Sequence, residues 1–384
     1  MKKNILIIIQ TLARGGAEKV AADLSKVLSK NNNVTIVLFK NEVQYEYAGE
    51  LLYVDTPDYS KAGLAQKCLI VKSRINQIKR IKIDRCTDIS ISFMPDGDLI
   101  NVLSHGNEVM IGTIHHNPYT ETARNSWHYY LRKIVLHKLQ LVITPSNQTR
   151  EAAIKRYELN KDSVYRIYNT CDVSRLSSTE FDATLGREYG INANDLCVVT
   201  MGSHRYEKAQ WHMIRAFKLI HDRYSNAKLI LIGDGPYKHE LNELSEKLEL
   251  NNNIVFTGHL NDPYSVLRLG KVFMFSSISE SFANVLIEAM AVGVPCVCAD
   301  CDYGPREILD DGKYGVLIPP FPQGKPDFSI NISDNERVMA DAVMDLLENP
   351  SKRQRLIEAG KQRAKDFDIE TLGENWEKIL KTFY

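Results

Sequence analysis

Two carboxylates stand in an otherwise apolar segment, SESFANVLIEAMAVGVPCV (279–297). The residues before it, KVFMFSS (271–277), predict a buried strand, so Glu280 should lie in the loop that follows this strand. Carboxylates accept hydrogen bonds from pairs of hydroxyl groups, such as those of sugars or ribose. Glu280 and Glu288 therefore indicate a site for a hydroxyl-rich ligand. The alternative is that Glu280 only complements the dipole of the next helix and that Glu288 is a snorkelling or exposed helix residue.

The helix that carries Glu288 is expected to begin near Phe282 or Ala283. Asn284 and Glu288 are four residues apart, so they share one face of this helix. The first N–H groups of a helix have no intrahelical acceptor and, together with the helix dipole, they attract anions. We therefore expect the N–H groups at the start of this helix, residues 282–284, to bind a phosphate group.

Two series of alternating strands and helices should position these groups. The first series predicts strands at 4–10, 33–39, 88–93, 109–114 and 141–146, with helices at 15–31 and from Ser146. A second series begins with a strand at 195–202. Such alternation is typical of parallel sheets covered by helices, in which ligands bind beyond the carboxyl ends of the strands. The expected fold class is α/β, with two doubly wound, Rossmann-like domains facing a cleft.

The alternation loosens near residues 170–190, which predicts the boundary between the domains. The expected domains are residues 1–172 and 190–362. The last segment, residues 363–384, predicts a helix that carries Trp376, and we expect this helix to dock on the N-terminal domain.

Length and composition fit this organisation. The chain has 384 residues, 44% of them hydrophobic and 25% charged, as expected for two globular domains of about 100–200 residues each. No apolar run reaches the ~20 residues that a membrane helix needs. The first residues, MKKNILIIIQ, predict a buried strand rather than a signal peptide, because no small-residue cleavage site follows. The expected location is cytoplasmic.

Charge is unevenly distributed along a chain whose net charge is zero. Residues 1–172 hold 24 Lys and Arg and 17 Asp and Glu, a balance of +7, and the remainder holds 24 and 31, a balance of −7. A basic half joined to an acidic half argues against a general nucleic-acid binder. It indicates that the first half binds something anionic.

Three of the seven cysteines, Cys296, Cys298 and Cys301, lie in the cluster CVCADC. A metal site would need further ligands at suitable spacing, and the sequence has no second Cys/His cluster of that kind. We interpret the three as small apolar side chains on a buried strand, and we expect no bound metal.

The turn GDG (233–235) follows a predicted strand and matches half of a dinucleotide-binding fingerprint. Lys238 stands where the third glycine would be. A nicotinamide-dependent enzyme is therefore not expected.

Several motifs, in order along the chain, resemble those of the retaining glycosyltransferases of family 4, which have the GT-B fold, and in particular enzymes of bacterial surface-polysaccharide synthesis. ESFANVLIE with AMAVGVPCV resembles the family's Glu-x7-Glu element, and TMGSHRYEKAQWHMIRAF resembles its donor-phosphate motif, GR-x-x-x-EKG. TLARGGAEKVAADLSKVL resembles its N-terminal glycine loop and first helix. The remaining matches are LILIGDGP, NIVFTGHLND, DYGPREIL and DGKYGVLIPP. The resemblance covers most of the chain and is strongest from 196 to 320.

The resemblance implies roles for the matched residues. Glu280 should contact hydroxyls of the transferred sugar, and Glu288 should contact the ribose of the nucleotide. Lys208 should hold the diphosphate as negative charge develops on it; the alternative is a solvated lysine at the start of a helix. The other donor-binding residues that it implies are Gly16, Ser203, Arg205, Gly233, Phe282, Ala283 and Asn284.

On the N-terminal side, Gly15 and Gly16 would permit close approach of phosphate or acceptor. His115 follows the strand at 109–114, where the family often has a cleft histidine that contacts the donor sugar. His116 is the alternative, and a histidine here could also be a satisfied loop residue.

Two departures from the family pattern matter. Ser203 follows Gly202 where the family usually has arginine, and a serine cannot replace a fixed guanidinium group. Arg205, two residues further on, is the candidate replacement. The glycine after Glu-x-Phe is Ala283 in this chain.

Two basic segments of the first half contain aromatic residues or lie close to them. Residues 122–150 hold five Lys and Arg and no acid, with Trp127, Tyr129 and Tyr130 among them, and residues 72–85 hold one acid. A basic helix face with aromatic side chains would bind an anionic bilayer or a lipid diphosphate. The alternative is a solvated helix face with core aromatics.

Together these features predict a retaining glycosyltransferase that moves a hexose or N-acetylhexosamine from a nucleotide sugar to a lipid-linked saccharide. A UDP-sugar is favoured, with a GDP-sugar as the alternative, and no cofactor is expected. The donor would bind the C-terminal domain and the acceptor the N-terminal domain, at the inner face of the cell membrane. Two alternatives remain: a catalytically silent partner subunit, motivated by Ser203, and a UDP-sugar epimerase of the same fold.

Overall fold

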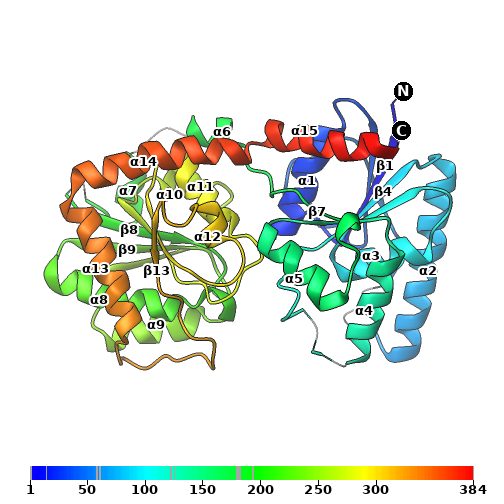
Figure 1. The fold of residues 1–384 in the computed structure, drawn as a ribbon. Helices are drawn as coiled ribbons and strands as arrows, with labels where there is room; N and C mark the ends of the chain where they lie inside the picture. Colours follow the sequence, from blue (N-terminus) through cyan, green and yellow to red (C-terminus); the bar gives the residue numbers. More distant parts are fainter. Residues whose placement is uncertain are drawn as a thin grey trace. The chain divides into compact units, whose positions relative to one another are not determined.

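The computed structural model describes residues 2–13, 15–57, 59, 62–121, 123–124, 126–178, 183–192 and 194–383. The chain divides into two compact units (Figure 1). Unit 1 is Met1–Thr170 with Ile369–Tyr384, and unit 2 is Cys171–Asp368. Each unit is built on a parallel sheet covered by helices, which confirms the predicted fold class.

Unit 1 contains a seven-stranded parallel sheet of order β3-β2-β1-β4-β5-β6-β7. The central strands are near-continuous apolar runs, because a parallel sheet is buried on both faces. The predicted strands are all present, and the two edge strands, β3 and β7, are additional. Their bounds are β1 Asn4–Ile9, β2 Asn33–Leu38, β3 Glu50–Tyr53, β4 Ile89–Phe93, β5 Val109–Thr113, β6 Leu141–Thr144 and β7 Val164–Arg166.

Helices cover both faces of this sheet. One face packs against α1 and α15, whose Trp376 and Leu380 are 3% and 0% exposed within the same apolar cluster as β1. Helices α2 and α3 cover one part of the opposite face, and helices α4 and α5 cover another part of it. The bounds are α1 Gly16–Leu28, α2 Leu64–Asp84, α3 Met94–Leu103, α4 Trp127–Lys138, α5 Asn147–Tyr157 and α15 Ile369–Leu380.

Unit 2 contains a six-stranded parallel sheet of order β10-β9-β8-β11-β12-β13. From β8 the chain proceeds outward through β9 and β10, and then returns to β11 on the other side of β8. The point between β8 and β11 is therefore the topological switch point, where ligands of such sheets bind. The strands are β8 Leu196–Met201, β9 Ala227–Ile232, β10 Ile254–Gly258, β11 Val272–Phe275, β12 Cys296–Ala299 and β13 Val316–Ile318.

The helices of unit 2 differ from the predicted ones mainly at their first residues. The helix expected from Ala283 or Phe282 begins at Asn284. The bounds are α6 Val173–Ser177, α7 Ala183–Glu188, α8 Gln210–Arg223, α9 Lys238–Lys247, α10 Tyr264–Leu267, α11 Asn284–Val292, α12 Pro305–Ile308, α13 Asp334–Glu348 and α14 Pro350–Ala364.

Within the described part of the chain, no helix combines the length and the apolar character that crossing a membrane requires.

Candidate functional site

The loops after β8 and β11 meet at the switch point of unit 2. The Ser276 hydroxyl donates to the backbone carbonyl of Lys208 at 2.8 Å and to that of Ala209 at 3.1 Å. The backbone N–H of Ile278 donates to the carbonyl of Glu207 at 2.9 Å. These bonds fix one loop on the other, so side chains carried by the two loops have a defined separation.

Lys208 and Glu280 form an ion pair across these loops. Lys208 Nζ lies 2.5 Å from Glu280 Oε1, and the side chains are 24% and 11% exposed. Lys208 ends the short 3₁₀ turn Tyr206–Lys208, and Ala209 then adopts a left-handed conformation (φ 46°) that redirects the chain into α8. A partly exposed ammonium beside a carboxylate can bind an anion and a hydroxyl group at adjacent positions.

The helix that carries Glu288 starts one or two residues later than predicted. Ala283 is the N-cap of α11 in a left-handed conformation (φ 63°), so Phe282 precedes the helix and its N–H is not one of the first helical groups. The helix therefore starts at Asn284, not at Phe282. Phe282 is 1% exposed and lies edge-to-face on Phe367, with ring centroids 5.9 Å apart.

Glu288 lies on the second turn of α11. It is 6% exposed, so the alternative of an exposed helix residue is wrong. The hydroxyl of Tyr264, in α10, donates to Glu288 Oε1 at 3.2 Å. The sequence interpretation did not single out Tyr264, because no motif marks it. A buried carboxylate with a tyrosine partner can accept further hydrogen bonds from ligand hydroxyl groups.

Glycines allow the loops after β8 and β9 to touch. A Cβ at Gly233 (φ 136°) would lie 2.2 Å from the carbonyl oxygen of Gly202, and one at Gly235 would lie 2.6 Å from that of His204. The N–H of Gly202 donates to the carbonyl of Ile232 at 2.9 Å. The two loops pack backbone against backbone at the carboxyl edge of the sheet, and this packing requires both glycines of the GDG turn.

The residues after Gly202 include Ser203, at which the sequence departs from the family pattern. Ser203 is half-buried and its carbonyl accepts a bond of 3.2 Å from the side-chain amide of Gln210, whereas Arg205 is exposed. Between them His204 is fully buried, and neither ring nitrogen has a hydrogen-bond partner within the described residues. Burial lowers the pKa of His204, so its ring is neutral at pH 7. No sequence signal identified this residue.

In unit 1, Gly15 is the N-cap of α1 and Gly16 is its first residue. The carboxylate of Glu18 lies over Gly15, since a Cβ on Gly15 would lie 1.9 Å from Glu18 Oε2. Burial raises the pKa of Glu18. The group that approaches Gly15 in this structure is the chain's own carboxylate, at the flexible end of the Glu18 side chain.

His115 and His116 follow β5 in unit 1. The His115 ring stacks on Phe93 with centroids 5.2 Å apart, and among the described residues neither of its nitrogens has a hydrogen-bond partner. Burial, and secondarily the neighbouring His116, lower the pKa of His115 from 6.5 to about 3. His116 is exposed. His115 is therefore a neutral ring held in one orientation.

The three cysteines of the CVCADC cluster are buried free thiols. Cys296 and Cys298 lie in β12, and Cys301 follows it. Burial raises the pKa of all three, and the carboxylate of Glu280 raises that of Cys301 further. These thiols are accordingly protonated and unreactive at pH 7.

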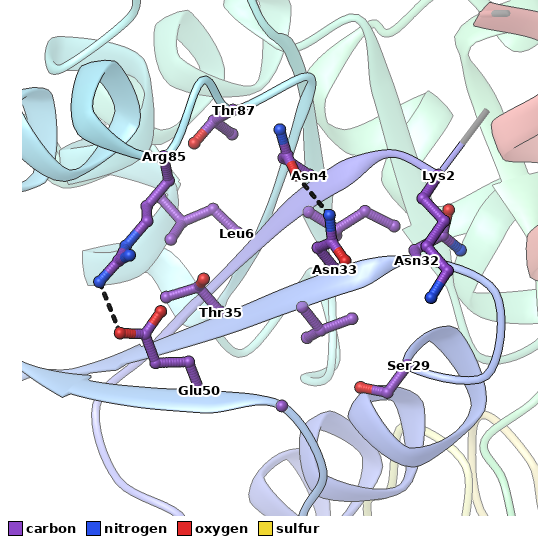
Figure 2. A pocket seen from close by; sticks show the side chains of 13 residues that line it. Lys2, Asn4, Leu6, Ser29, Asn32, Asn33, Thr35, Glu50, Arg85 and Thr87 are labelled. Atoms are coloured by element: carbon purple, nitrogen blue, oxygen red, sulfur yellow. Dashed lines mark hydrogen bonds and ion pairs between the residues drawn. The ribbon is translucent and has the colours of Figure 1, made fainter.

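A cavity of about 490 Å³ in unit 1 lies at the amino ends of the strands, the edge opposite to their carboxyl ends (Figure 2). Asn33 Nδ2 donates to Asn4 Oδ1 at 3.0 Å, and Arg85 pairs with Glu50 at 2.5 Å. None of the candidate site residues lines this cavity.

Two family models match consecutive parts of the chain. The model described as Glycosyltransferase Family 4 matches residues 14–175, and the one described as Glycosyl transferases group 1 matches residues 182–363.

Individual proteins are similar over comparable spans. An uncharacterized glycosyltransferase of Methanocaldococcus jannaschii is 30% identical over 257 residues, 63% of each chain. A Campylobacter jejuni protein, named N-acetylgalactosamine-N,N'-diacetylbacillosaminyl-diphospho-undecaprenol 4-alpha-N-acetylgalactosaminyltransferase, is 25% identical over 375 residues, 94% of this chain and 95% of the relative. Among solved structures, Anabaena HepE in complex with UDP has a TM-score of 0.81 at 19% identity, with 100% of each chain covered.

Proposed function

The chain belongs to glycosyltransferase family 4, and from that premise we propose that it is a retaining enzyme that transfers a sugar from a UDP-sugar to a lipid-linked saccharide. The transferred sugar would be a hexose or an N-acetylhexosamine. The names of the Campylobacter relatives describe transfer to undecaprenol-diphosphate-linked saccharides, and HepE has been solved with UDP and with UDP-glucose. These names support the acceptor class and the donor nucleotide proposed for this chain.

The observation that carries the proposal is the Lys208–Glu280 pair at the switch point of unit 2, with Glu288 on the adjoining helix. In the proposed complex the Lys208 ammonium binds the diphosphate, and Glu280 accepts hydrogen bonds from hydroxyls of the transferred sugar. Glu288, oriented by Tyr264, accepts them from the ribose. The N–H groups at the start of α11 add positive potential beside the diphosphate.

The chemistry proposed for this arrangement is attack from the face that the diphosphate leaves. The acceptor hydroxyl oxygen bonds to the anomeric carbon while the bond from that carbon to the phosphate oxygen breaks, and the hydroxyl proton passes to the departing phosphate oxygen. Lys208 stabilises the negative charge that develops on the leaving group. No protein nucleophile takes part, so configuration at the anomeric carbon is retained in a single transfer.

Calorimetric titration of the purified chain with UDP, GDP and ADP tests the donor site. We expect micromolar binding of UDP that Glu288→Ala weakens at least tenfold, the equivalent of about 1.4 kcal/mol. Glu246→Ala, which removes an exposed glutamate of α9, is the matched control and should bind as the wild type does. Tighter binding of GDP than of UDP would indicate that the donor is a GDP-sugar. If none of the three nucleotides binds, the chain has no working donor site.

A second candidate is a catalytically silent partner subunit. It is favoured by Ser203, which stands at the family's arginine position, and by the exposure of Arg205. Transfer assays with UDP-glucose and UDP-N-acetylglucosamine and a short-chain lipid diphosphate saccharide separate the two candidates. Nucleotide binding without product formation for any donor would favour the silent subunit.

A further inference from the structure

The connection between β13 and α13 is a long irregular segment of unit 2 (Figure 1). It spans residues 319–333 and contains no helix or strand. Connections in compact domains usually have about 4–6 residues, and much longer ones without secondary structure are generally functional or disordered. We call these residues the β13–α13 segment. Its contacts hold it in one position, against the loops that carry Lys208 and Glu280.

A buried arginine of α8 holds the later part of this segment. Arg215 is 2% exposed, and its Nη1 donates to the backbone carbonyls of Asp327 at 2.6 Å and Ser329 at 3.0 Å. Its Nε donates to Glu336, in the first turn of α13, at 2.8 Å. A buried guanidinium that lost these acceptors would be costly, so the bonds keep the β13–α13 segment on α8.

Two phenylalanines of the segment pack on the first turn of α8. The Phe328 ring lies edge-to-face on Trp211, with centroids 5.5 Å apart, and Phe321 stacks on His212 at 4.1 Å. Phe328 also lies beside Tyr237, with centroids 5.6 Å apart. Tyr237 follows the GDG turn and precedes α9. The β13–α13 segment therefore contacts the loop after β9 as well as α8.

The hydroxyl of Tyr206 joins the middle of the segment to the loop after β8. It donates to the carbonyl of Gly324 at 2.5 Å and accepts a bond of 3.2 Å from the N–H of the same glycine. Tyr206 and Lys208 belong to one short 3₁₀ turn, in which Lys208 is the last residue. The two bonds therefore hold the turn that carries the ammonium group.

The neighbouring residue, Gln323, joins the segment to the loop after β11. Its side-chain amide donates to the backbone carbonyl of Ile278 at 3.2 Å. Ile278 is 3% exposed and lies two residues before Glu280. Consecutive residues of one segment thus bind the two loops that supply the members of the ion pair.

We propose that Tyr206 and Gln323 are positioning residues that, through the β13–α13 segment, set the separation of Lys208 and Glu280 at the donor. The inference rests on the proposed function, which places the donor at this pair. In this role neither positioning side chain touches the sugar nucleotide. The bonds of Tyr206 are exposed to solvent, so water replaces them in a variant at little cost to folding. A displacement of about 1 Å at a group that acts on the transition state, in contrast, lowers the rate about 100-fold.

The first test is Tyr206→Phe, which removes the hydroxyl and keeps the ring that lies beside Trp211. The assay measures UDP release from UDP-glucose or UDP-N-acetylglucosamine in the presence of the short-chain lipid diphosphate saccharide. We expect kcat to fall about 10–100-fold. The Kd of UDP should change far less than kcat, because the proposed ribose contact, Glu288, lies on another element, α11. The midpoint of urea unfolding should stay that of the wild type.

Tyr224→Phe is the matched control. The hydroxyl of Tyr224 also bonds a residue distant in the sequence, Glu348, but it lies at the opposite end of α8 from Lys208. This variant should keep the wild-type kcat. A loss as large as that of Tyr206→Phe would show that the effect does not depend on the segment, and would overturn the proposal.

Gln323→Leu tests the second bond and should lower kcat about 10-fold. Because both bonds hold the same segment, the double variant Tyr206→Phe/Gln323→Leu should lose less than the product of the two single losses. Gly324→Ala keeps the backbone groups that bond Tyr206, and its added Cβ has no atom within 4 Å, so it should keep the wild-type kcat.

Wild-type kcat in both single variants would overturn the proposal. So would a loss of UDP affinity as large as the loss of kcat, or single losses that multiply fully in the double variant. Failure of the proposed function has a different signature, since the wild type itself would then neither bind UDP nor release it from a sugar donor. Equal activity of the wild type and Tyr206→Phe would leave the proposed function in place and reject only the role of the β13–α13 segment.

Discussion

At the scale of single residues, Lys208 and Glu280 are far apart in the sequence but form an ion pair in the structure. They are 72 residues apart along the chain and are brought to 2.5 Å by two loops that hydrogen-bond each other. Each side chain neutralises the charge of the other, because this edge of the sheet is only partly exposed to water. The residue types could be predicted from the sequence; their pairing could not, because nothing local specifies a contact between loops of different strands.

The first prediction concerns this pair. Glu280→Gln keeps the shape of the side chain but removes its charge, so we expect turnover to fall by about 10²–10³-fold, as for loss of one group that stabilises a transition state. Lys208→Ala should have a similar effect. The measurement is kcat with the donor selected by titration, with thermal unfolding as the test of folding. Glu246→Gln, which changes an exposed glutamate of α9, should retain full activity; wild-type rates from a folded Glu280→Gln protein would contradict the assigned role.

The second prediction concerns pH. The pKa of His115 is about 3 in the folded protein and ordinarily 6.5, so between these values the unfolded chain binds a proton that the folded chain does not. The stability due to neutral His115 is complete above pH 6.5 and is lost as the pH falls. Between pH 7 and pH 5 we expect wild type to lose about 1–2 kcal/mol more unfolding free energy than His115→Gln.

Urea unfolding at the two pH values measures this difference. His116→Gln removes the exposed neighbour and should keep the wild-type pH dependence. Equal losses in wild type and His115→Gln would show that the ring is accessible to protons in the folded state.

At the scale of elements, strands were easier to predict than helix ends. The runs NILIII and LCVVTM are apolar on both faces, and only a buried parallel strand accommodates such a run. The edge strands β3 and β7 are short and partly exposed, so their sequences carry no such pattern. The start of α11 was misplaced because its N-cap is Ala283, not one of the polar capping residues.

Two helices of the site begin after an alanine in the left-handed conformation. Ala209 precedes α8 and Ala283 precedes α11. A non-glycine residue in this conformation is strained by about 1–2 kcal/mol, so surrounding contacts must hold it. The family's glycine was matched to Ala283 from the sequence, but the strained geometry of both alanines was visible only in the structure.

The third prediction concerns the loop that packs on the start of α11. Gly304 has φ 107°, and a Cβ there would lie 2.4 Å from the carbonyl oxygen of Phe282. Gly304→Ala should lower the free energy of unfolding by about 2–4 kcal/mol and weaken UDP binding, because the backbone that precedes α11 must move. Urea unfolding and calorimetry measure the two effects. Gly324→Ala, with nothing within 4 Å of the added Cβ, should change neither; a neutral Gly304→Ala would mean that the loop is not packed on Phe282.

At the scale of the whole molecule, unit 1 is assembled from both ends of the chain. The C-terminal helix α15 contributes Trp376 and Leu380 to the apolar cluster that contains β1 and α1. Trp376 was the reason to expect that α15 docks on the N-terminal domain. In the structure, α15 packs in the apolar cluster that contains the isoleucines of β1.

The fourth prediction tests that packing. Trp376→Ala should destabilise unit 1 by about 3–5 kcal/mol, as for other buried tryptophans, and leave UDP binding by unit 2 unchanged. Hydrogen exchange followed by mass spectrometry should show loss of protection in β1 and α1. Tyr53→Ala, an exposed aromatic of the same unit, is the control. Unchanged protection of β1 in Trp376→Ala would place α15 outside the core of unit 1.

The division of unit 1 between both ends of the chain also bears on the order of events during synthesis. The ribosome makes Met1–Thr170 first, but the helix that completes this unit follows 198 residues later, after the whole of Cys171–Asp368. At about 5–20 residues per second, the first part waits about 10–40 s for its last helix. Unit 2, although second in the sequence, is the first unit whose residues are all available, so the nascent chain exposes the isoleucine-rich face of β1 to chaperones until α15 has been made.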